Sequence, residues 1–189
     1  MAPAARAART LWLLRHAKAA TDPPPGGSDF DRVLTPRGRR DAAALGRLLA
    51  HGAAGLGPAL RGVPLPAVAL VSAAVRTAAT AELVLAELNP PPEVRLDHEL
   101  YGADPEEVLA SVRALPDDVA AVMVVGHNPT ALALAQGLIA EGEQKALSLA
   151  VRQGFPTCAL GVYRFKAARW ADVAAHSAKL VALTVPPYE

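Results

Sequence analysis

The 189-residue sequence predicts an α/β protein with helices on both faces of a mainly parallel β-sheet, a three-layer α/β/α sandwich. Short apolar runs alternate with segments of helical periodicity, and most of these helical segments begin at recognisable capping residues. In the last part of the chain we predict two strands and no helix. The length suits one domain with a substantial core. We expect that domain to span residues 10–189, after a disordered tail of residues 1–9.

The first elements are a strand, a long loop and a helix. The strand is predicted at residues 10–14 (TLWLL), and the polar, Pro/Gly-rich loop at residues 17–34. The helix begins after Thr35, which is a suitable N-cap, with Pro36 in the first helical position. Gly52 suits the end of this helix.

The middle of the chain repeats the alternation of strand and helix. Residues 52–66 are rich in Gly and Pro and predict an extended connection to a second strand at residues 67–71 (AVALV). Ser72 is predicted to cap the next helix, which continues to Leu88. A short third strand follows at residues 93–96 (EVRL).

The remaining elements complete the sheet. Residues 104–107 (DPEE) form a capping box with proline in the first helical position, and residues 120–126 (AAVMVVG) predict a strongly buried fourth strand. Another helix is predicted to begin at Asn128 and to end near residue 140. Two later apolar segments, at residues 158–165 and roughly 178–185, predict strands on either side of a basic turn.

Composition excludes several classes of protein. With 19 basic and 18 acidic residues the net charge is +1, which argues against a general nucleic-acid or membrane-surface binder. The single cysteine, Cys158, excludes an intrachain disulfide and a multi-cysteine metal site. No apolar run approaches the roughly 18 to 20 residues that span a bilayer. We expect a cytoplasmic protein in a reducing compartment.

Charged and titratable side chains follow four predicted strands, at the point where each strand ends. Ligands of such sheets bind outside the carboxyl ends of the strands, and helices that begin there add free N–H groups. Each residue alone would more often be structural than functional, and we interpret His98 in that way. The joint placement indicates a site for a phosphoryl group, formed by Arg15, His16, Arg76, Glu99 and His127.

Four segments in the same order carry a family resemblance: LLRHAKA, VSAAVRTAATAELV, ELYGA and VMVVGHNP. They resemble the signatures of the histidine phosphatase superfamily, which has the phosphoglycerate-mutase-like fold. The RHA form with a following lysine, the LTPRGRRDA helix start and the ELYGA segment look most like the short bacterial phosphohistidine phosphatase (SixA-type) branch. The resemblance covers roughly residues 10–165. Ala17 stands where many members of the superfamily have glycine.

The resemblance implies a role for each residue of the predicted site. It implies that His16 is the nucleophile and that Arg15 and Arg76 bind the phosphoryl group. It further implies that His127 is the second catalytic histidine and that Glu99 belongs to the catalytic carboxylate region. The two arginines can neutralise a phosphate dianion, so we expect neither a metal nor another cofactor.

The resemblance implies a phosphatase that forms a phosphohistidine intermediate on His16. The loop after the third strand is short, which suggests an open site, and we favour protein phosphohistidine as the substrate. A small-molecule phosphomonoesterase remains an alternative, as does a phospho-binding regulatory module without turnover. A mutase is disfavoured because the sequence shows no lid.

Overall fold

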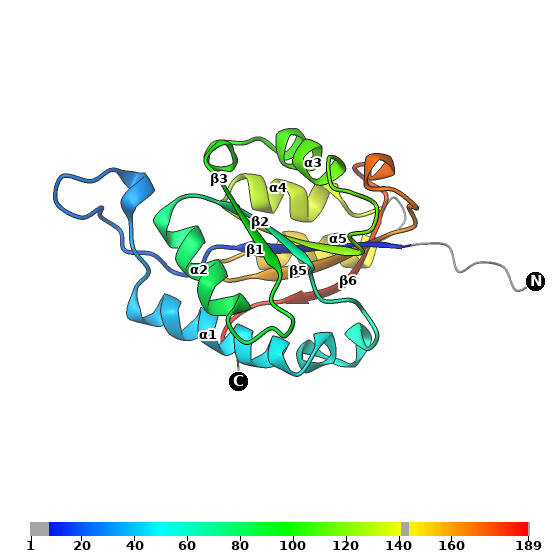
Figure 1. Ribbon diagram of the computed structural model, residues 1–189, viewed down its shortest axis with the longest axis horizontal. Coiled ribbons are helices and arrows are strands. Elements are labelled where there is room, and N and C mark those ends of the chain that lie inside the picture. Colours follow the sequence, from blue (N-terminus) through cyan, green and yellow to red (C-terminus); the bar gives the residue numbers. More distant parts are fainter. Residues whose placement is uncertain (1–7, 141–143, 189) are drawn as a thin grey trace, which may run out of the picture.

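The structure is a computed structural model that describes residues 8–140 and 144–188. Its strands form one six-stranded sheet in the order β3-β2-β4-β1-β5-β6 (Figure 1). The pairs β1–β4, β2–β4 and β2–β3 are parallel, whereas β5 and β6 join antiparallel at one edge. The strands are β1 (Arg9–Arg15), β2 (Val68–Ser72), β3 (Glu93–Asp97), β4 (Ala121–Gly126), β5 (Leu160–Phe165) and β6 (Ala178–Thr184).

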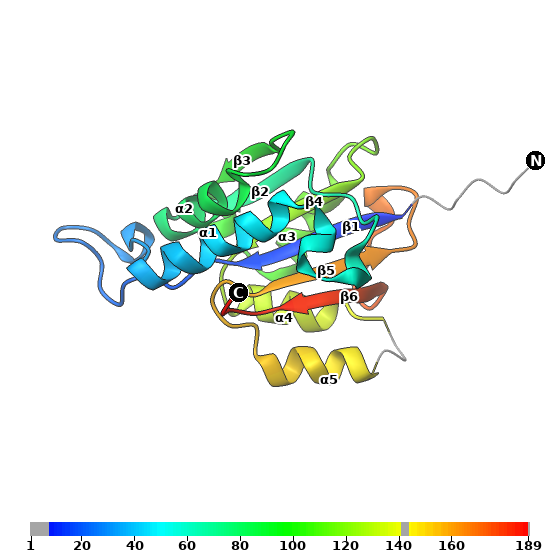
Figure 2. The same cartoon turned by 90° about the horizontal axis from the view of Figure 1, so that it is seen from below.

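Helices cover both faces of this sheet and make three layers (Figure 1), and the view from below shows the helices of one face in front of the strands (Figure 2). One face packs against α1 and α2, and the other packs against α3, α4 and α5. The helices are α1 (Pro36–Ala50), α2 (Val75–Leu85), α3 (Pro105–Arg113), α4 (Thr130–Gly137) and α5 (Gln144–Gln153). Short 3-10 turns lie between them: η1 (Asp29–Asp31), η2 (Ala53–Leu56), η3 (Pro58–Leu60), η4 (Glu99–Tyr101) and η5 (Trp170–Asp172).

Strand β1 lies inside the sheet, between β4 and β5, and is buried on both faces because a hydrophobic cluster covers each face of the sheet there. Trp12 and Leu14 pack into the cluster under α1 and α2, whereas Leu11 and Leu13 pack into the cluster on the opposite face. This placement explains a continuous apolar run where a half-exposed strand would alternate apolar and polar residues. The strand thereby fixes the backbone of Arg15 rigidly at the edge of the core.

The predicted fold class and the mainly parallel sheet are confirmed. Thr35 caps α1 by accepting a hydrogen bond from the Gly38 amide at 3.1 Å. Asp104 likewise caps α3, with the expected capping box. Local capping chemistry was therefore a reliable guide to where these helices begin.

Three details of the prediction were wrong. Ser72 is the last residue of β2 and does not cap α2, which begins after Ala74 and ends at Leu85. The connection at residues 52–66 is not simply extended, since it contains η2 and η3. Helix α5, on the far face of the sheet, was not predicted.

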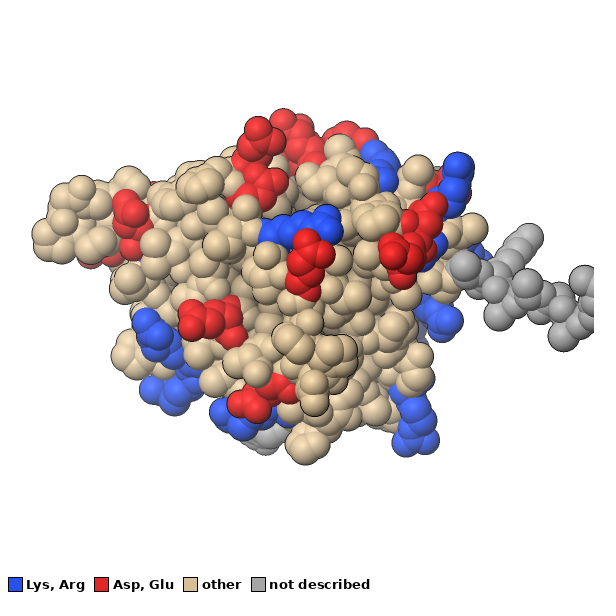
Figure 3. All heavy atoms as spheres, in the orientation of Figure 1, with Lys and Arg blue, Asp and Glu red and all other residues tan. Residues whose placement is uncertain are grey.

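The expected disordered tail lies mostly outside the described residues, because residues 1–7 are not described. Arg9 already belongs to β1 and is buried. None of the helices in the described part of the chain is long and apolar enough to cross a membrane. On the face shown in Figure 3, basic and acidic side chains are scattered among neutral ones, in keeping with the net charge of +1.

Candidate functional site

The carboxyl ends of β1 and β4 bring His16 and His127 together. The two strands are parallel neighbours, and Arg15 lies opposite Gly126. One residue further on, the His16 amide donates a hydrogen bond to the Gly126 carbonyl at 3.0 Å. The two imidazole rings, whose centroids are 5.2 Å apart, therefore lie at one edge of the sheet. The structure thus unites two residues that are 111 positions apart in sequence (127 − 16).

The His16 ring is held in a defined orientation. Its Nδ1 lies 2.8 Å from the carbonyl oxygen of Ala17, and a carbonyl can only accept, so Nδ1 carries the hydrogen. The lone pair of the neutral ring is then on Nε2. Burial lowers the pKa of His16 to about 3, and the positive charges of Arg76 and Arg15 contribute in the same direction. His16 is therefore neutral at pH 7 and has a nucleophilic nitrogen.

Two arginines lie close enough to this ring for their charges to lower its pKa. Arg15 Nη1 donates to the Phe155 carbonyl at 3.1 Å, and burial lowers the pKa of Arg15. Arg76, in the first turn of α2, is only 5% exposed. The Nε atoms of both arginines are buried without a hydrogen-bond partner among the described residues. Buried donors of this kind are suited to an oxyanion.

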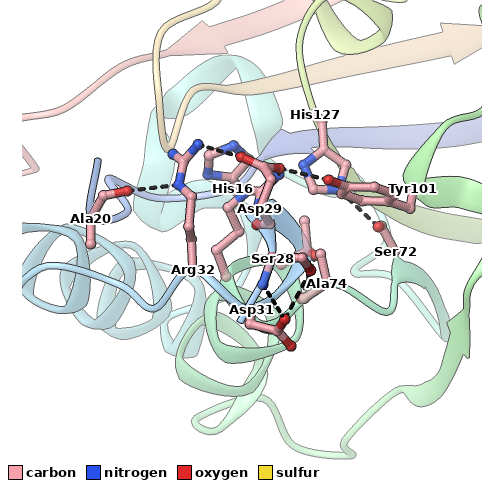
Figure 4. Close-up of polar contacts among 12 residues, drawn as sticks. His16, Ala20, Ser28, Asp29, Asp31, Arg32, Ser72, Ala74, Tyr101 and His127 are labelled. Carbon is pink, nitrogen blue, oxygen red and sulfur yellow. Dashed lines mark hydrogen bonds and ion pairs between the residues drawn. The ribbon is translucent and has the colours of Figure 1, made fainter. Parts of the chain in front are cut away.

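His127 contacts two further side chains. Its Nε2 lies 2.8 Å from the Ser72 hydroxyl, and the Tyr101 ring packs edge-on against it with centroids 5.4 Å apart (Figure 4). Burial lowers the pKa of His127 to about 4, helped by the charge of Arg76, while Asp29 acts in the opposite direction. Its Nδ1 is buried and has no partner among the described residues.

The long loop after β1 supplies two charged residues that the sequence analysis missed, Asp29 and Arg32 (Figure 4). The Asp29 carboxylate accepts hydrogen bonds from Arg76 at 2.8 Å, Arg32 at 2.7 Å and Tyr101 at 2.6 Å. Arg76 also donates to the Asp29 carbonyl at 2.5 Å. The Tyr101 hydroxyl and the two arginines hold the pKa of Asp29 well below its usual range. The DFDR segment at residues 29–32, a run of charged residues within the loop that follows β1, was the signal that could have identified both residues.

Glu99 lies at the start of η4, just after β3, and is exposed. Its amide donates to Asp97 at 2.8 Å, and its carboxylate forms no hydrogen bond or ion pair with the other predicted site residues within the described part of the chain. The catalytic role of Glu99 therefore stays a prediction. His98 stacks on Phe30 at 5.4 Å, which fits the structural interpretation of this residue.

Positive charge at the site comes from arginine side chains. Across residues 8–140 and 144–188, no three His, Cys, Asp or Glu side chains gather in a way that could hold a metal ion. Cys158 is buried, and burial raises the pKa of its thiol to about 12. A buried thiol with a raised pKa is a poor nucleophile at neutral pH.

The fold defines a class: α/β/α proteins with a mainly parallel sheet, here with two histidines and two arginines at the carboxyl edge of that sheet. The chain belongs to the histidine phosphatase superfamily, since residues 11–104 match the family model for branch 1 of that superfamily. Two uncharacterised mycobacterial proteins are related over 92% of this chain and 99% of their own length. That of Mycobacterium tuberculosis is 36% identical over 174 residues, and that of Mycobacterium leprae is 34% identical over 175 residues.

Solved structures narrow the family to its SixA-like branch. The candidate phosphohistidine phosphatase SixA of Nakamurella multipartitia is 33% identical, with a TM-score of 0.73 over 95% of this chain and 97% of that chain. Its counterpart from Agrobacterium tumefaciens is 31% identical, with a TM-score of 0.73 over 94% and 98% of the two chains. The protein histidine phosphatase SixA complexed with tungstate is 25% identical, with a TM-score of 0.66 over 92% and 95%. These similarities support a phosphatase activity.

Proposed function

We propose that the protein hydrolyses phosphohistidine on other proteins through a phosphohistidine intermediate on His16. The observation that carries the proposal is the His16 ring: Nδ1 is bound to the Ala17 carbonyl, and Nε2 keeps its lone pair next to two arginines. An anion-binding module without turnover needs the arginines but has no use for a neutral, oriented imidazole.

In the first step His16 Nε2 attacks phosphorus, and the bond from phosphorus to the leaving group breaks. The leaving group departs with the bonding electron pair and takes up a proton. In the second step water attacks the phosphorus of phospho-His16, and the phosphorus–nitrogen bond breaks to release inorganic phosphate. The water gives up one proton, and the enzyme returns to its initial state.

The two arginines and His127 have the chemistry needed to stabilise both steps. Charge spreads over the equatorial oxygens in the transition state, and the unpaired donors of Arg15, Arg76 and His127 suit those oxygens. Because guanidinium groups supply this charge, we expect turnover to survive chelation of metal ions. Tungstate is a tetrahedral oxyanion like phosphate, and its binding to a SixA protein with a TM-score of 0.66 supports an oxyanion site here.

Glu99 is the proposed proton donor to the leaving group and base for water. Its support is its position in η4, two residues before Tyr101, which contacts both His127 and Asp29. Asp29 is a poor substitute as an acid, because its contacts with Tyr101, Arg32 and Arg76 favour the ionised form.

The surroundings of His127 leave room for a macromolecular substrate. Residues 101–105, His127 and the start of α4 line an open groove of about 340 Å³ beside the site. The connection from β3 to α3 is short and contains only the single turn η4, so no lid arises there. The similarity to SixA proteins supports the same substrate class, and the single buried thiol suits the cytoplasmic compartment that we propose.

A substrate panel tests the proposal: a phosphohistidine protein, sugar phosphates, nucleotides and p-nitrophenyl phosphate, each with and without EDTA. We expect the phosphohistidine protein to give the highest kcat/KM and EDTA to have no effect. A preference for a small ester would support a phosphomonoesterase instead. Binding of phosphate with no turnover of any substrate would support the non-catalytic module.

A further inference from the structure

Ser72 ends β2 directly beside His127, where the function proposed above gives it no role. Strands β2 and β4 are parallel neighbours with Val71 opposite Val125, so Ser72 and His127 emerge at the same edge of the sheet. The Ser72 side chain is fully buried, and its Oγ lies 2.8 Å from His127 Nε2. Within the described residues the hydroxyl has this ring nitrogen as its hydrogen-bond partner.

The position of the hydrogen on the His127 ring decides which nitrogen donates a hydrogen bond and which nitrogen accepts one. A neutral imidazole carries one hydrogen, either on Nδ1 or on Nε2. With the hydrogen on Nε2, the ring would donate to Ser72 and turn the lone pair of Nδ1 toward an oxyanion, which is repulsive. With the hydrogen on Nδ1, the Ser72 hydroxyl donates to Nε2, and Nδ1–H becomes a free donor.

The surroundings of the ring favour the second arrangement. Nδ1 is buried and has no partner in the described part of the chain, whereas Nε2 is occupied by Ser72. Figure 4 shows the His127 ring between Ser72 and His16. The charged groups around it are Arg15, Arg76, Arg32 and Asp29, and three of these four are cations that disfavour a doubly protonated ring.

We propose that Ser72 is a positioning residue that donates its hydroxyl hydrogen to Nε2 and thereby holds His127 in the tautomer whose Nδ1–H faces the transferred phosphoryl group. The proposal rests on the phosphatase function above. A purely structural hydroxyl would stabilise the β2–β4 edge without selecting a tautomer.

The decisive experiment is ¹⁵N NMR of the imidazole nitrogens in the full-length protein near pH 7, with the His127→Ala variant used for assignment. We expect His127 to be protonated on Nδ1 in the wild type. Ser72→Ala should shift the ring to the Nε2-protonated tautomer that predominates in free histidine, or to a mixture. Ser72→Thr keeps a hydroxyl and should restore the Nδ1 tautomer, whereas Ser72→Cys supplies only a weak donor and should not.

Kinetics and binding give the second readout. By analogy with groups that orient metal-ligand histidines, Ser72→Ala should lower kcat by about 10- to 100-fold, with partial recovery in Ser72→Thr. The same variant should weaken binding of inorganic phosphate, measured by calorimetry. Ser177→Ala is the matched control, because that exposed serine donates to the Ala174 carbonyl, in the turn before β6 and away from the site.

Two results would overturn the proposal: wild-type His127 protonated on Nε2, or an unchanged Nδ1 tautomer in Ser72→Ala. The tautomer and the phosphate affinity are measured without turnover. If no phosphorylated substrate is hydrolysed, the proposed function fails, while these two measurements still decide the role of Ser72.

Discussion

Strand β1 has an arginine at each end, and the two side chains have different surroundings. Arg9 donates to the carbonyls of Val119 (3.1 Å) and Ala168, lies 5.9 Å above the Trp170 ring and is 3.8 Å from Asp117. Arg15, at the other end, donates to the Phe155 carbonyl and follows the strand into the site. Arg9 thus contacts two carbonyls, an aromatic ring and a carboxylate, whereas the side chain of Arg15 makes one hydrogen bond within the described residues.

The comparison shows which observation identifies a binding site. The Nε atoms of Arg9 and Arg15 are both buried and unpaired in the described residues, so a single unpaired nitrogen does not distinguish the two ends. The two ends differ in the charged and titratable groups nearby. Arg15 lies near Arg76 and near two histidines whose pKa values are lowered. Gathering cations and buried imidazoles raises the electrostatic free energy, and a bound anion offsets it.

The largest effect should come from His16→Ala at the site end. Removal of the nucleophile should lower kcat by at least about 10⁴-fold. Because the ring lies at a strand tip and contributes little to the core, the melting temperature should change by less than about 4 °C. Acid-labile, base-stable phosphate should be trapped on His16 in the wild type. His51→Ala, at the exposed end of α1, is the control. Wild-type-like activity in His16→Ala would refute the mechanism.

The two arginines of β1 should show opposite effects. Arg15→Ala should lower kcat/KM by about 10- to 150-fold, since a charge-assisted hydrogen bond contributes roughly 1.5 to 3 kcal/mol. Arg9→Ala should instead lower the free energy of unfolding by about 1 to 3 kcal/mol, because the Ala168 carbonyl loses its arginine donor and the Val119 carbonyl keeps only the Trp170 indole donor. Steady-state kinetics and urea unfolding of both variants measure the contrast. An equal loss of kcat/KM in Arg9→Ala would abolish the distinction between the two ends.

Glu99→Gln should discriminate between leaving groups. An alkoxide needs a proton in order to leave, whereas a phosphorylated imidazole can take up its proton before cleavage. The ratio of wild-type to variant rates should therefore be at least about tenfold larger for alkyl phosphates, or about 1.4 kcal/mol in barrier. Glu87→Gln, at an exposed position after α2, is the control. Equal rate ratios for both substrates would mean that Glu99 is not the proton donor to the leaving group. Asp97 and Asp104 would then be the next carboxylates to test.

The histidines should also make stability depend on pH. The folded state holds His16 at a pKa of about 3, whereas the unfolded chain titrates near its usual value of about 6.5. Between these values the unfolded state binds more protons, so the free energy of unfolding decreases as pH falls from 6.5 toward 3. His16→Ala should reduce this slope by up to about 1.4 kcal/mol per pH unit. Urea unfolding of the wild type and of His16→Ala at several pH values measures this slope. The same slope in both proteins would contradict a neutral His16.

The smallest effect is expected for Asp29→Asn. The Asp29 carboxylate forms an ion pair with Arg76, and its negative charge repels a phosphate that approaches the same guanidinium group. Arg76 is buried, but the Asp29 carboxylate is open to solvent, and ion pairs that solvent reaches are worth roughly 0.2 to 1 kcal/mol. The inhibition constant of inorganic phosphate should therefore fall by about 1.4- to fivefold. Asp31→Asn is the matched control, because that carboxylate bonds to Ser28. Weaker phosphate binding in Asp29→Asn would mean that Asp29 instead holds Arg76 in its productive orientation.

The sequence by itself determined the alternation of strands and helices from β1 to α4 and the edge at which His16, Arg76 and His127 emerge. Apolar runs, the Thr35 cap and the capping box at Asp104 depend on neighbouring residues, so they can be interpreted locally. The ends of parallel strands then bring together side chains that are far apart in sequence.

Only the tertiary structure decided which side chains touch. Because β2 pairs with β4, Ser72 belongs to the strand and not to the start of α2, and its hydroxyl contacts the His127 ring. Folding of the loop after β1 brings Asp29 onto Arg76, 47 residues further along the chain. Strand order and loop closure depend on long-range contacts, which local propensity does not encode. The tautomer and the lowered pKa of each histidine depend in turn on those contacts.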